Sequence, residues 1–193
     1  NFVIDGHRKA VEAMSSRANR VDQMYGSRNP RYNVNPKKEQ QIWSSLILQL
    51  EKNEKLPAVA FAFSKHRIDV NTSNLNNLDL LNSSEKNQVI VFFDNSINVL
   101  NEADRELPQV KTLKELLQRG IGVHHSGILP ILKEIVKMLF QRGLVKVLFA
   151  TDTLAMGVNM PARTVIFDSI RKHDKEGFRN LLPGEYIQMA GRA

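Results

Sequence analysis

Residues 145–163 constrain the fold more than any other part of this sequence. They begin with a short apolar run of Val, Leu and Phe residues, which is typical of a strand buried on both faces. Small and hydroxylated residues follow at once, including Thr151 and Thr153, and then Gly157 and Asn159. Open α/β sheets bind ligands just beyond the carboxyl ends of such strands. The stretch therefore indicates a ligand-binding turn, although a strand and loop without chemistry is also compatible with these residues alone.

The rest of the chain alternates between strand-like and helix-like segments. Apolar, strand-like runs occupy residues 57–63, 121–125, 145–149 and 164–168. Segments with helical periodicity or helix caps occupy residues 36–55, 84–101, 113–119 and 130–142. This alternation predicts an α/β fold, in which a mostly parallel sheet is flanked by helices.

Composition narrows the class of protein. The chain has 193 residues, 42% of them apolar, which suits one domain or one domain with an appendage. It contains no cysteine, so disulfides and thiolate metal sites are excluded. No apolar run approaches the length of a membrane span, and the first residues show no signal-peptide pattern. We therefore expect a soluble, intracellular protein that does not contact a membrane.

The positive charge is concentrated at the start of the chain. The first 38 residues hold eight Lys and Arg against three acidic residues, which accounts for +5 of the formal net charge of +7. Two Asn-Pro steps between residues 27 and 38 are typical of a loop or linker. We predict a basic inter-domain arm over residues 1–35 and a compact domain over residues 36–193. A solvated tether is favoured over specific RNA contact for this arm.

Polar residues directly follow three of the predicted strands. They form three pairs: Ser64 and Lys65, Ser126 and Gly127, and Thr151 and Thr153. Parallel strands deliver their carboxyl ends to one edge of a sheet, so we expect these residues to lie in a row. Hydroxyls, backbone amides and a lysine suit a phosphodiester backbone contacted without reading its bases. Sugar-phosphate or nucleotide binding is the alternative at this level.

The paired histidines, His124 and His125, do not indicate a metal site. Adjacent residues on a strand point to opposite faces of the sheet, so the two imidazoles cannot readily bind one ion. We predict that one is packed and that the other forms hydrogen bonds near the strand end. No metal ligands are predicted in this chain.

A turn signal at residues 175–177 lies between two short extended stretches and predicts a β-hairpin. The hairpin carries several cations, among them Arg171, Lys172 and Arg179, and Phe178 is available to stack. A wedge or guide for a nucleic-acid duplex and a solvated surface hairpin are equally compatible with this pattern.

The last residues predict a helix that presents Gln188 and Arg192 one turn apart on a shared face. An amide and a guanidinium placed in this way can meet the phosphates of a nucleotide, because the arginine fork matches phosphate geometry.

Together these segments resemble a known family of motor proteins. Residues 150–162 resemble motif V of superfamily-two helicases, residues 188–193 resemble motif VI, and residues 61–65 resemble motif IV. Within that superfamily, residues 124–130 and 156–161 resemble the superkiller-type DExH RNA helicases. The resemblance covers about residues 36–193 and extends loosely through the arm. The His-Ser step at residues 125 and 126 fits the cytoplasmic type, whereas His-Gly would fit the nuclear exosome type better.

The resemblance implies the second RecA-like domain of a helicase motor, with the hairpin before motif VI, and it implies roles for individual residues. RNA would be held by Ser64, Lys65, Ser126, Gly127, Thr151 and Thr153. The basic hairpin adds Arg171 and Lys172 as candidate RNA contacts. ATP would be met by Gly157, Asn159, Gln188 and Arg192, of which Gln188 and Arg192 would be catalytic.

Two departures from a complete motor follow from the printed sequence. It contains no Gly-x-x-x-x-Gly-Lys-Ser/Thr P-loop and no Asp-Glu-x-His segment, so the Mg²⁺ ligands are expected in a first RecA-like domain. Motif VI stops at Ala193, before the Gly-Arg that the family carries next. The chain is therefore expected to be half of an ATPase and inactive by itself.

The family further implies an ATP-dependent RNA helicase that unwinds or threads RNA in the 3'-to-5' direction for decay by the RNA exosome. Its expected partners are RNA, the other domains of the same helicase, superkiller complex subunits and the exosome. Its expected location is the cytoplasm, or the nucleus for the nuclear relative. A motor-less RNA-binding or scaffold module with the same fold, and an unrelated α/β metabolic enzyme, are the alternatives.

Overall fold

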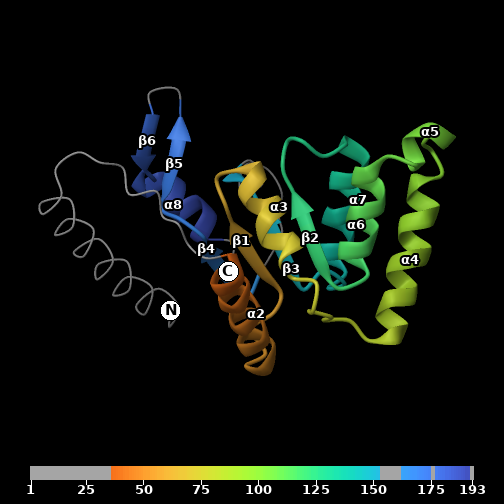
Figure 1. Cartoon of the computed structure of the whole chain (residues 1–193), viewed down its shortest axis with the longest axis horizontal. Coiled ribbons are helices and arrows are strands. Elements are labelled where there is room, and N and C mark those ends of the chain that lie inside the picture. Colours follow the sequence, from red (N-terminus) through yellow and green to blue (C-terminus); the bar gives the residue numbers. More distant parts are fainter. Residues whose placement is uncertain (1–35, 153–161, 175–176, 192–193) are drawn as a thin grey trace, which may run out of the picture. The chain divides into compact units, whose positions relative to one another are not determined.

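The computed structural model describes residues 36–152, 162–174 and 177–191 (Figure 1). The chain divides into two units between residues 38 and 39, and the elements described below belong to the second unit, apart from the first residues of helix α2. The basic arm predicted over residues 1–35 lies outside the described residues. The arm and its boundary with the domain therefore stay a prediction.

A four-stranded parallel sheet forms the centre of this unit, with strand order β2-β3-β1-β4. Its strands are β1 (Ala58–Phe61), β2 (Ile121–His124), β3 (Val147–Ala150) and β4 (Thr164–Phe167). Phe61 lies beside both Ala150 and Phe167, and Ala150 lies beside His124. All four strands therefore end level at the same edge, which we call the carboxyl edge. The predicted parallel sheet is confirmed.

The two central strands, β1 and β3, are buried along their whole length, as their apolar composition predicts. Phe149 of β3 meets Trp43 edge to face, with 5.0 Å between the ring centroids. Aromatic pairs in this geometry add to the stability that burial alone provides. The sheet and the helices around it thus share one apolar core, in which Trp43 packs rather than binding a ligand.

Helices flank the sheet (Figure 1). They are α2 (Pro36–Lys52), α3 (Lys65–Ser73), α4 (Ser83–Ile97), α5 (Glu102–Arg105), α6 (Pro108–Leu117), α7 (Pro130–Gln141) and α8 (Pro183–Ala190). Helices α6 and α7 pack against β2, and α4 packs against both of them. Helix α7 turns a continuous apolar stripe inward, and its buried members are Leu132, Ile135, Val136, Leu139 and Phe140.

Helices α3, α5 and α6 differ from the sequence-based expectation, and α5 was not predicted. Helix α3 was not predicted, because its residues are mostly polar and show almost no amphipathic periodicity. It begins because Ser64 caps it, accepting a hydrogen bond from the Arg67 amide at 3.4 Å. Helix α6 begins at Pro108, five residues before the predicted start, and proline is favoured at the first helical position.

The predicted hairpin is present. Strands β5 (Arg171–Asp174) and β6 (Gly177–Asn180) pair antiparallel beside helix α8 (Figure 1). Gly177 has a φ of +126°, a conformation that side-chain-bearing residues rarely adopt. A glycine at this position therefore lets the chain turn back into β6.

One buried side chain breaks the apolar pattern of the core. Asn71 of α3 is fully buried, and within the part of the chain that the structure describes neither its amide oxygen nor its amide nitrogen has a hydrogen-bond partner. We expect Asn71→Leu to raise the free energy of unfolding of the 193-residue chain by about 1–3 kcal/mol, because an unpaired buried amide is costly. Urea denaturation would measure the change. Asn71→Asp, which keeps the shape but adds a charge, should lower the stability instead; a loss of stability in both variants would contradict the interpretation.

Candidate functional site

The carboxyl edge brings together the described members of the three predicted residue pairs. Ser64 and Lys65 begin α3 after β1, Ser126 and Gly127 follow β2, and Thr151 follows β3. The Thr151 amide donates to the His124 carbonyl at 3.2 Å, which continues the ladder between β3 and β2 past the last strand residues. The described residues of the three pairs therefore lie at one edge of the sheet, and their contact with RNA stays a prediction. Thr153 lies outside the described residues.

Lys65 and the turn after β2 are close neighbours. A Cβ atom on Gly127 would lie 3.3 Å from Cδ of Lys65 and 3.1 Å from Nδ1 of His125. The missing side chain at Gly127 thus leaves room for the lysine stem. The exposed Lys65 and the backbone of the turn can therefore face one ligand together.

His125 shapes this turn. Its buried imidazole accepts a hydrogen bond at Nδ1 from the Gly127 amide, at 3.0 Å, and its Nε2 lies 3.7 Å from a carboxylate oxygen of Asp69. Nδ1 must be unprotonated to accept this bond, which places the proton of a neutral ring on Nε2. Burial lowers the pKa of His125, so the neutral form is favoured. This is the predicted hydrogen-bonding histidine.

His124 faces the other side of the sheet. Burial lowers its pKa, and the charge of Lys133 on α7 lowers it further. A Cβ on Gly122, two residues before His124 on β2, would meet Val136 of α7, whereas the His125 ring lies beside Asp69 of α3, in agreement with the predicted opposite orientation of the two rings. In residues 36–152, 162–174 and 177–191, no three His, Asp or Glu side chains gather closely enough to hold a metal ion.

An ion pair that was not predicted fixes the start of α3 to the end of β4. Arg67 donates to both carboxylate oxygens of Asp168, at 2.7 and 3.1 Å, and the carboxylate is only 9% exposed. Two parallel hydrogen bonds give such a pair a defined geometry. Asp168 follows β4 directly, so its position at the carboxyl edge was the available sequence signal. The pair holds the helix end that carries Ser64 and Lys65.

The two predicted RNA contacts on the hairpin differ in their surroundings. Arg171 is exposed, whereas the ammonium of Lys172 lies 2.5 Å from Glu185 and 3.4 Å from Asp152. Phe178 is 73% exposed and meets His173 edge to face. Lys172 thus sits among carboxylates in this structure, and its role toward RNA stays a prediction.

Helix α8 presents Gln188 on an exposed face. The helix is anchored by the buried Met189 and by Tyr186, whose ring stacks on Phe167 at the end of β4 with 4.8 Å between centroids. The anchoring places the start of motif VI beside the sheet. The other predicted nucleotide-binding residues, Gly157, Asn159 and Arg192, lie outside the described residues.

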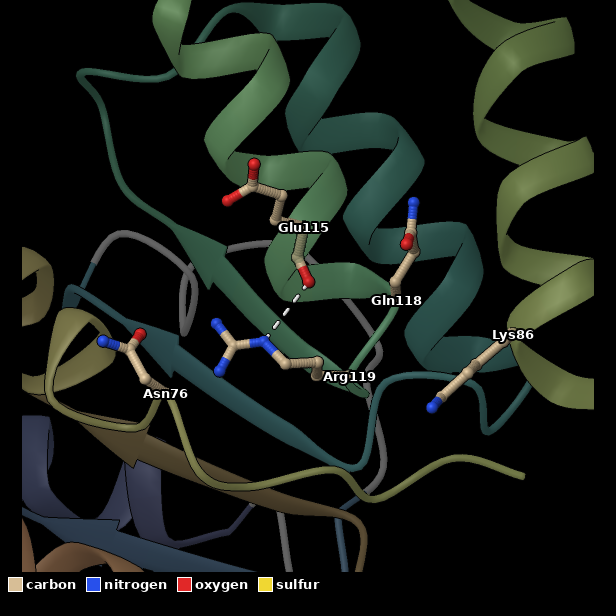
Figure 2. A pocket seen from close by; sticks show the side chains of 5 residues that line it. All are labelled: Asn76, Lys86, Glu115, Gln118 and Arg119. Atoms are coloured by element: carbon tan, nitrogen blue, oxygen red, sulfur yellow. Dashed lines mark hydrogen bonds between the residues drawn. The ribbon is translucent and has the colours of Figure 1, made fainter. Parts of the chain in front are cut away.

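A shallow pocket of about 370 Å³ lies away from this edge, where the chain leaves α6 and approaches the start of β2 (Figure 2). Its lining residues are Asn76, Lys86, Glu115, Gln118 and Arg119. Arg119 donates to the backbone carbonyls of Glu115 at 3.4 Å and Leu75 at 2.7 Å. The guanidinium therefore serves the local backbone, and none of the predicted site residues lines this pocket.

No described helix combines the length and the apolar character needed to cross a membrane.

Comparison with known proteins agrees with the motifs. Residues 70–193 match the helicase conserved C-terminal domain. Superkiller complex protein 2 of Mus musculus is 55% identical over 192 residues, which cover 100% of this chain and 15% of that protein. Antiviral helicase SKI2 of Saccharomyces cerevisiae is 48% identical over 168 residues, or 87% of this chain and 13% of that protein. Exosome RNA helicase MTR4 of Mus musculus is 47% identical over 152 residues, covering 79% and 14%.

The chain thus spans only a small part of the relatives that it matches. The matched family, the four-stranded parallel sheet between helices and the antiparallel hairpin agree with a RecA-like α/β fold. The chain belongs to the family of helicase conserved C-terminal domains, and its predicted resemblance to the second RecA-like domain of superkiller-type DExH-box helicases is confirmed.

Proposed function

We propose that this chain is the second motor domain of an ATP-dependent RNA helicase. One observation supports the proposal above others: the polar residues that follow β1, β2 and β3 lie at one edge of the sheet. Strand β4 ends at the same edge, and its Phe167 supports helix α8, which begins motif VI. Relatives named as RNA helicases agree with it. The motor-less RNA-binding module is the second candidate, because RNA binding at the carboxyl edge does not by itself require ATP hydrolysis.

In this proposal the carboxyl edge holds the RNA backbone. Lys65 supplies a cation at the first turn of α3, where the helix dipole also favours a phosphate. Ser126 and Thr151 supply hydroxyl groups beside it, whereas the amides of Gly127 and Thr151 donate to His125 and His124 within the fold. Because these contacts go to phosphates, binding should be insensitive to base sequence and should weaken with salt. Thr153 and the exposed Arg171 would extend the same contact surface.

The nucleotide would meet the other side of motifs V and VI. Gly157 and Asn159 would approach the sugar, while Gln188 and Arg192 would reach the terminal phosphate. The P-loop and the Mg²⁺ ligands would come from a first RecA-like domain, since the sequence contains neither. ATP would then bind between two domains, and its hydrolysis would change the contacts that the two domains make with RNA.

We further propose that the parent protein acts in RNA decay with the exosome and superkiller complex subunits, translocates in the 3'-to-5' direction and works in the cytoplasm. These expectations rest on the relatives' names and on the resemblance.

Hydrolysis by the chain and by its parent tests the proposal. The purified 193-residue chain should show no RNA-stimulated ATP hydrolysis, whereas the intact parent should hydrolyse ATP and be stimulated by RNA. Release of phosphate with and without single-stranded RNA measures both. A parent that binds RNA without hydrolysing ATP would establish the scaffold alternative. Robust turnover by the chain alone would refute the assignment of parts.

Thr153→Ala tests the division between RNA and nucleotide contacts. In the parent, the RNA concentration for half-maximal stimulation should rise about tenfold, because a hydrogen bond to a charged phosphate is lost. Basal hydrolysis should change much less. Thr112→Ala, at an exposed position on α6, is the matched control. An equal fall in basal and stimulated hydrolysis would show that Thr153 does not act mainly on RNA.

A further inference from the structure

One carboxylate connects the hairpin to the motif VI helix. Glu185, in the first turn of α8, receives two hydrogen bonds from the guanidinium of Arg179, both at 2.9 Å. The ammonium of Lys172 lies 2.5 Å from the same carboxylate, and the Leu182 amide donates to it at 2.8 Å. Both strands of the hairpin are thus tied to the first turn of the helix, since Lys172 belongs to β5 and Arg179 to β6.

The connection extends to the turn after β3 and includes a further carboxylate within the hairpin. Lys172 also lies 3.4 Å from Asp152, in the turn after β3, and Arg179 donates to Asp174 at 2.5 Å. The motif V turn, the hairpin and the motif VI helix therefore share one network of ion pairs. We call these five residues the Glu185 network; they are Asp152, Lys172, Asp174, Arg179 and Glu185.

The network's charges are held in their ionised forms. Hydrogen bonds from Arg179 and then from Lys172 keep the pKa of Glu185 well below its usual range. The hydrogen bond with Glu185 in turn raises the pKa of Lys172. Three carboxylates face two cations, so the Glu185 network itself carries no net positive charge.

Helix α8 does not need this network to stay in place. Tyr186 stacks on Phe167, and Met189 is buried in the core. Ion pairs of Lys172 with Asp152 and Glu185, and of Arg179 with Glu185, join β5 and β6 to residues outside the hairpin. Losing the carboxylate should therefore loosen the hairpin while the helix keeps its anchors.

We infer that Glu185 is a positioning residue that makes the hairpin, the motif V turn and the motif VI helix move as one body. The inference rests on the proposed function, in which the hairpin faces RNA and Gln188 and Arg192 face ATP. Isolated surface ion pairs contribute little to stability. A bidentate arginine–carboxylate pair within a network, however, fixes the relative orientation of the two side chains. Glu185 thus couples the movement of the hairpin to that of the motif VI helix, and it need not contact RNA or ATP.

The test is Glu185→Gln in the intact parent helicase, with hydrolysis and duplex unwinding measured on the same RNA. The amide keeps the size of the side chain but loses the charge that holds Arg179 and Lys172. We expect the ATP consumed per base pair unwound to rise at least about threefold, the size of change that loss of coupling produces. The matched control is Glu106→Gln, which removes an exposed ion pair with Lys111. It should leave this ratio unchanged.

Stability separates positioning from a merely structural role. The melting temperature of the Glu185→Gln parent should shift no more than that of the Glu106→Gln control. A ratio that stays at the wild-type value, or hydrolysis and unwinding that fall in proportion with the melting temperature, would overturn the inference. A wild-type parent without RNA-stimulated hydrolysis would overturn the proposed function and this inference together, whereas an active parent that is insensitive to Glu185→Gln overturns only the inference.

A double-mutant cycle assigns the part played by Lys172. If Lys172 acts through Glu185, then Lys172→Gln should raise the ratio on its own, and Lys172→Gln with Glu185→Gln should be no worse than the more severe single variant. If the two single variants instead multiplied each other's effect on the ATP consumed per base pair, Lys172 would act elsewhere, for example on RNA. That result would overturn the proposed link between the hairpin and the motif V turn.

Discussion

Replacing Arg192 with alanine in the parent protein should lower kcat for RNA-stimulated ATP hydrolysis by about 10³-fold. A guanidinium that meets the terminal phosphate stabilises the charge that develops in the transition state, and such arginines contribute about 10³–10⁵-fold. The KM for ATP should change far less, because the contact strengthens mainly in the transition state. Steady-state hydrolysis at saturating RNA measures both constants.

Two further variants make this experiment specific to Arg192. Arg192→Lys keeps a positive charge but loses the paired donors, so it should recover only a small part of the rate. Arg142→Ala is the matched control, because this exposed arginine at the end of α7 stacks on Phe92 of α4, 4.2 Å from the ring centroid. A fall of less than about tenfold for Arg192→Ala would contradict its assignment as the arginine that meets the terminal phosphate.

Removing residues 172–179 should impair duplex unwinding more than RNA-stimulated hydrolysis. The hairpin presents exposed Phe178 and Arg171 beside the motif VI helix, where a base or a strand can stack. The removal also takes away both cations that pair with Glu185, so the ATP consumed per base pair should rise as well. Unwinding that stays intact would exclude the hairpin from strand separation.

A smaller change separates the two contributions. Phe178→Ala leaves the Glu185 network in place and removes only the stacking surface. It should slow unwinding about tenfold if one base stacks on the ring, since such a contact contributes about 1–3 kcal/mol. Val99→Ala, at a side chain that is 78% exposed, is the control for loss of a surface apolar group. An unwinding rate like that of the control would show that the hairpin acts through its position rather than through Phe178.

Much of the sheet was predictable because buried strands and their helices leave periodic signals. The apolar runs marked all four strands, and the residues after them marked the carboxyl edge. Helix α3 was not predicted, because its mostly polar residues form no periodic apolar stripe and its start depends on the N-cap Ser64. The strand order was also not predictable, since β1 lies between β3 and β4, which are distant from it in the chain.

The sequence by itself determined the class of fold, the family and the residue types at the site. It could do so because a buried strand requires apolar residues, and phosphate chemistry requires hydroxyl, amide and guanidinium groups at set spacings. Only the tertiary structure decided which charges face one another. Asp152, Lys172 and Glu185 are far apart in the chain, and no spacing rule pairs them. Ion pairs form over a few ångströms in space. Lys172, which the sequence predicts as an RNA contact, therefore lies beside the carboxylates of Asp152 and Glu185 in the fold.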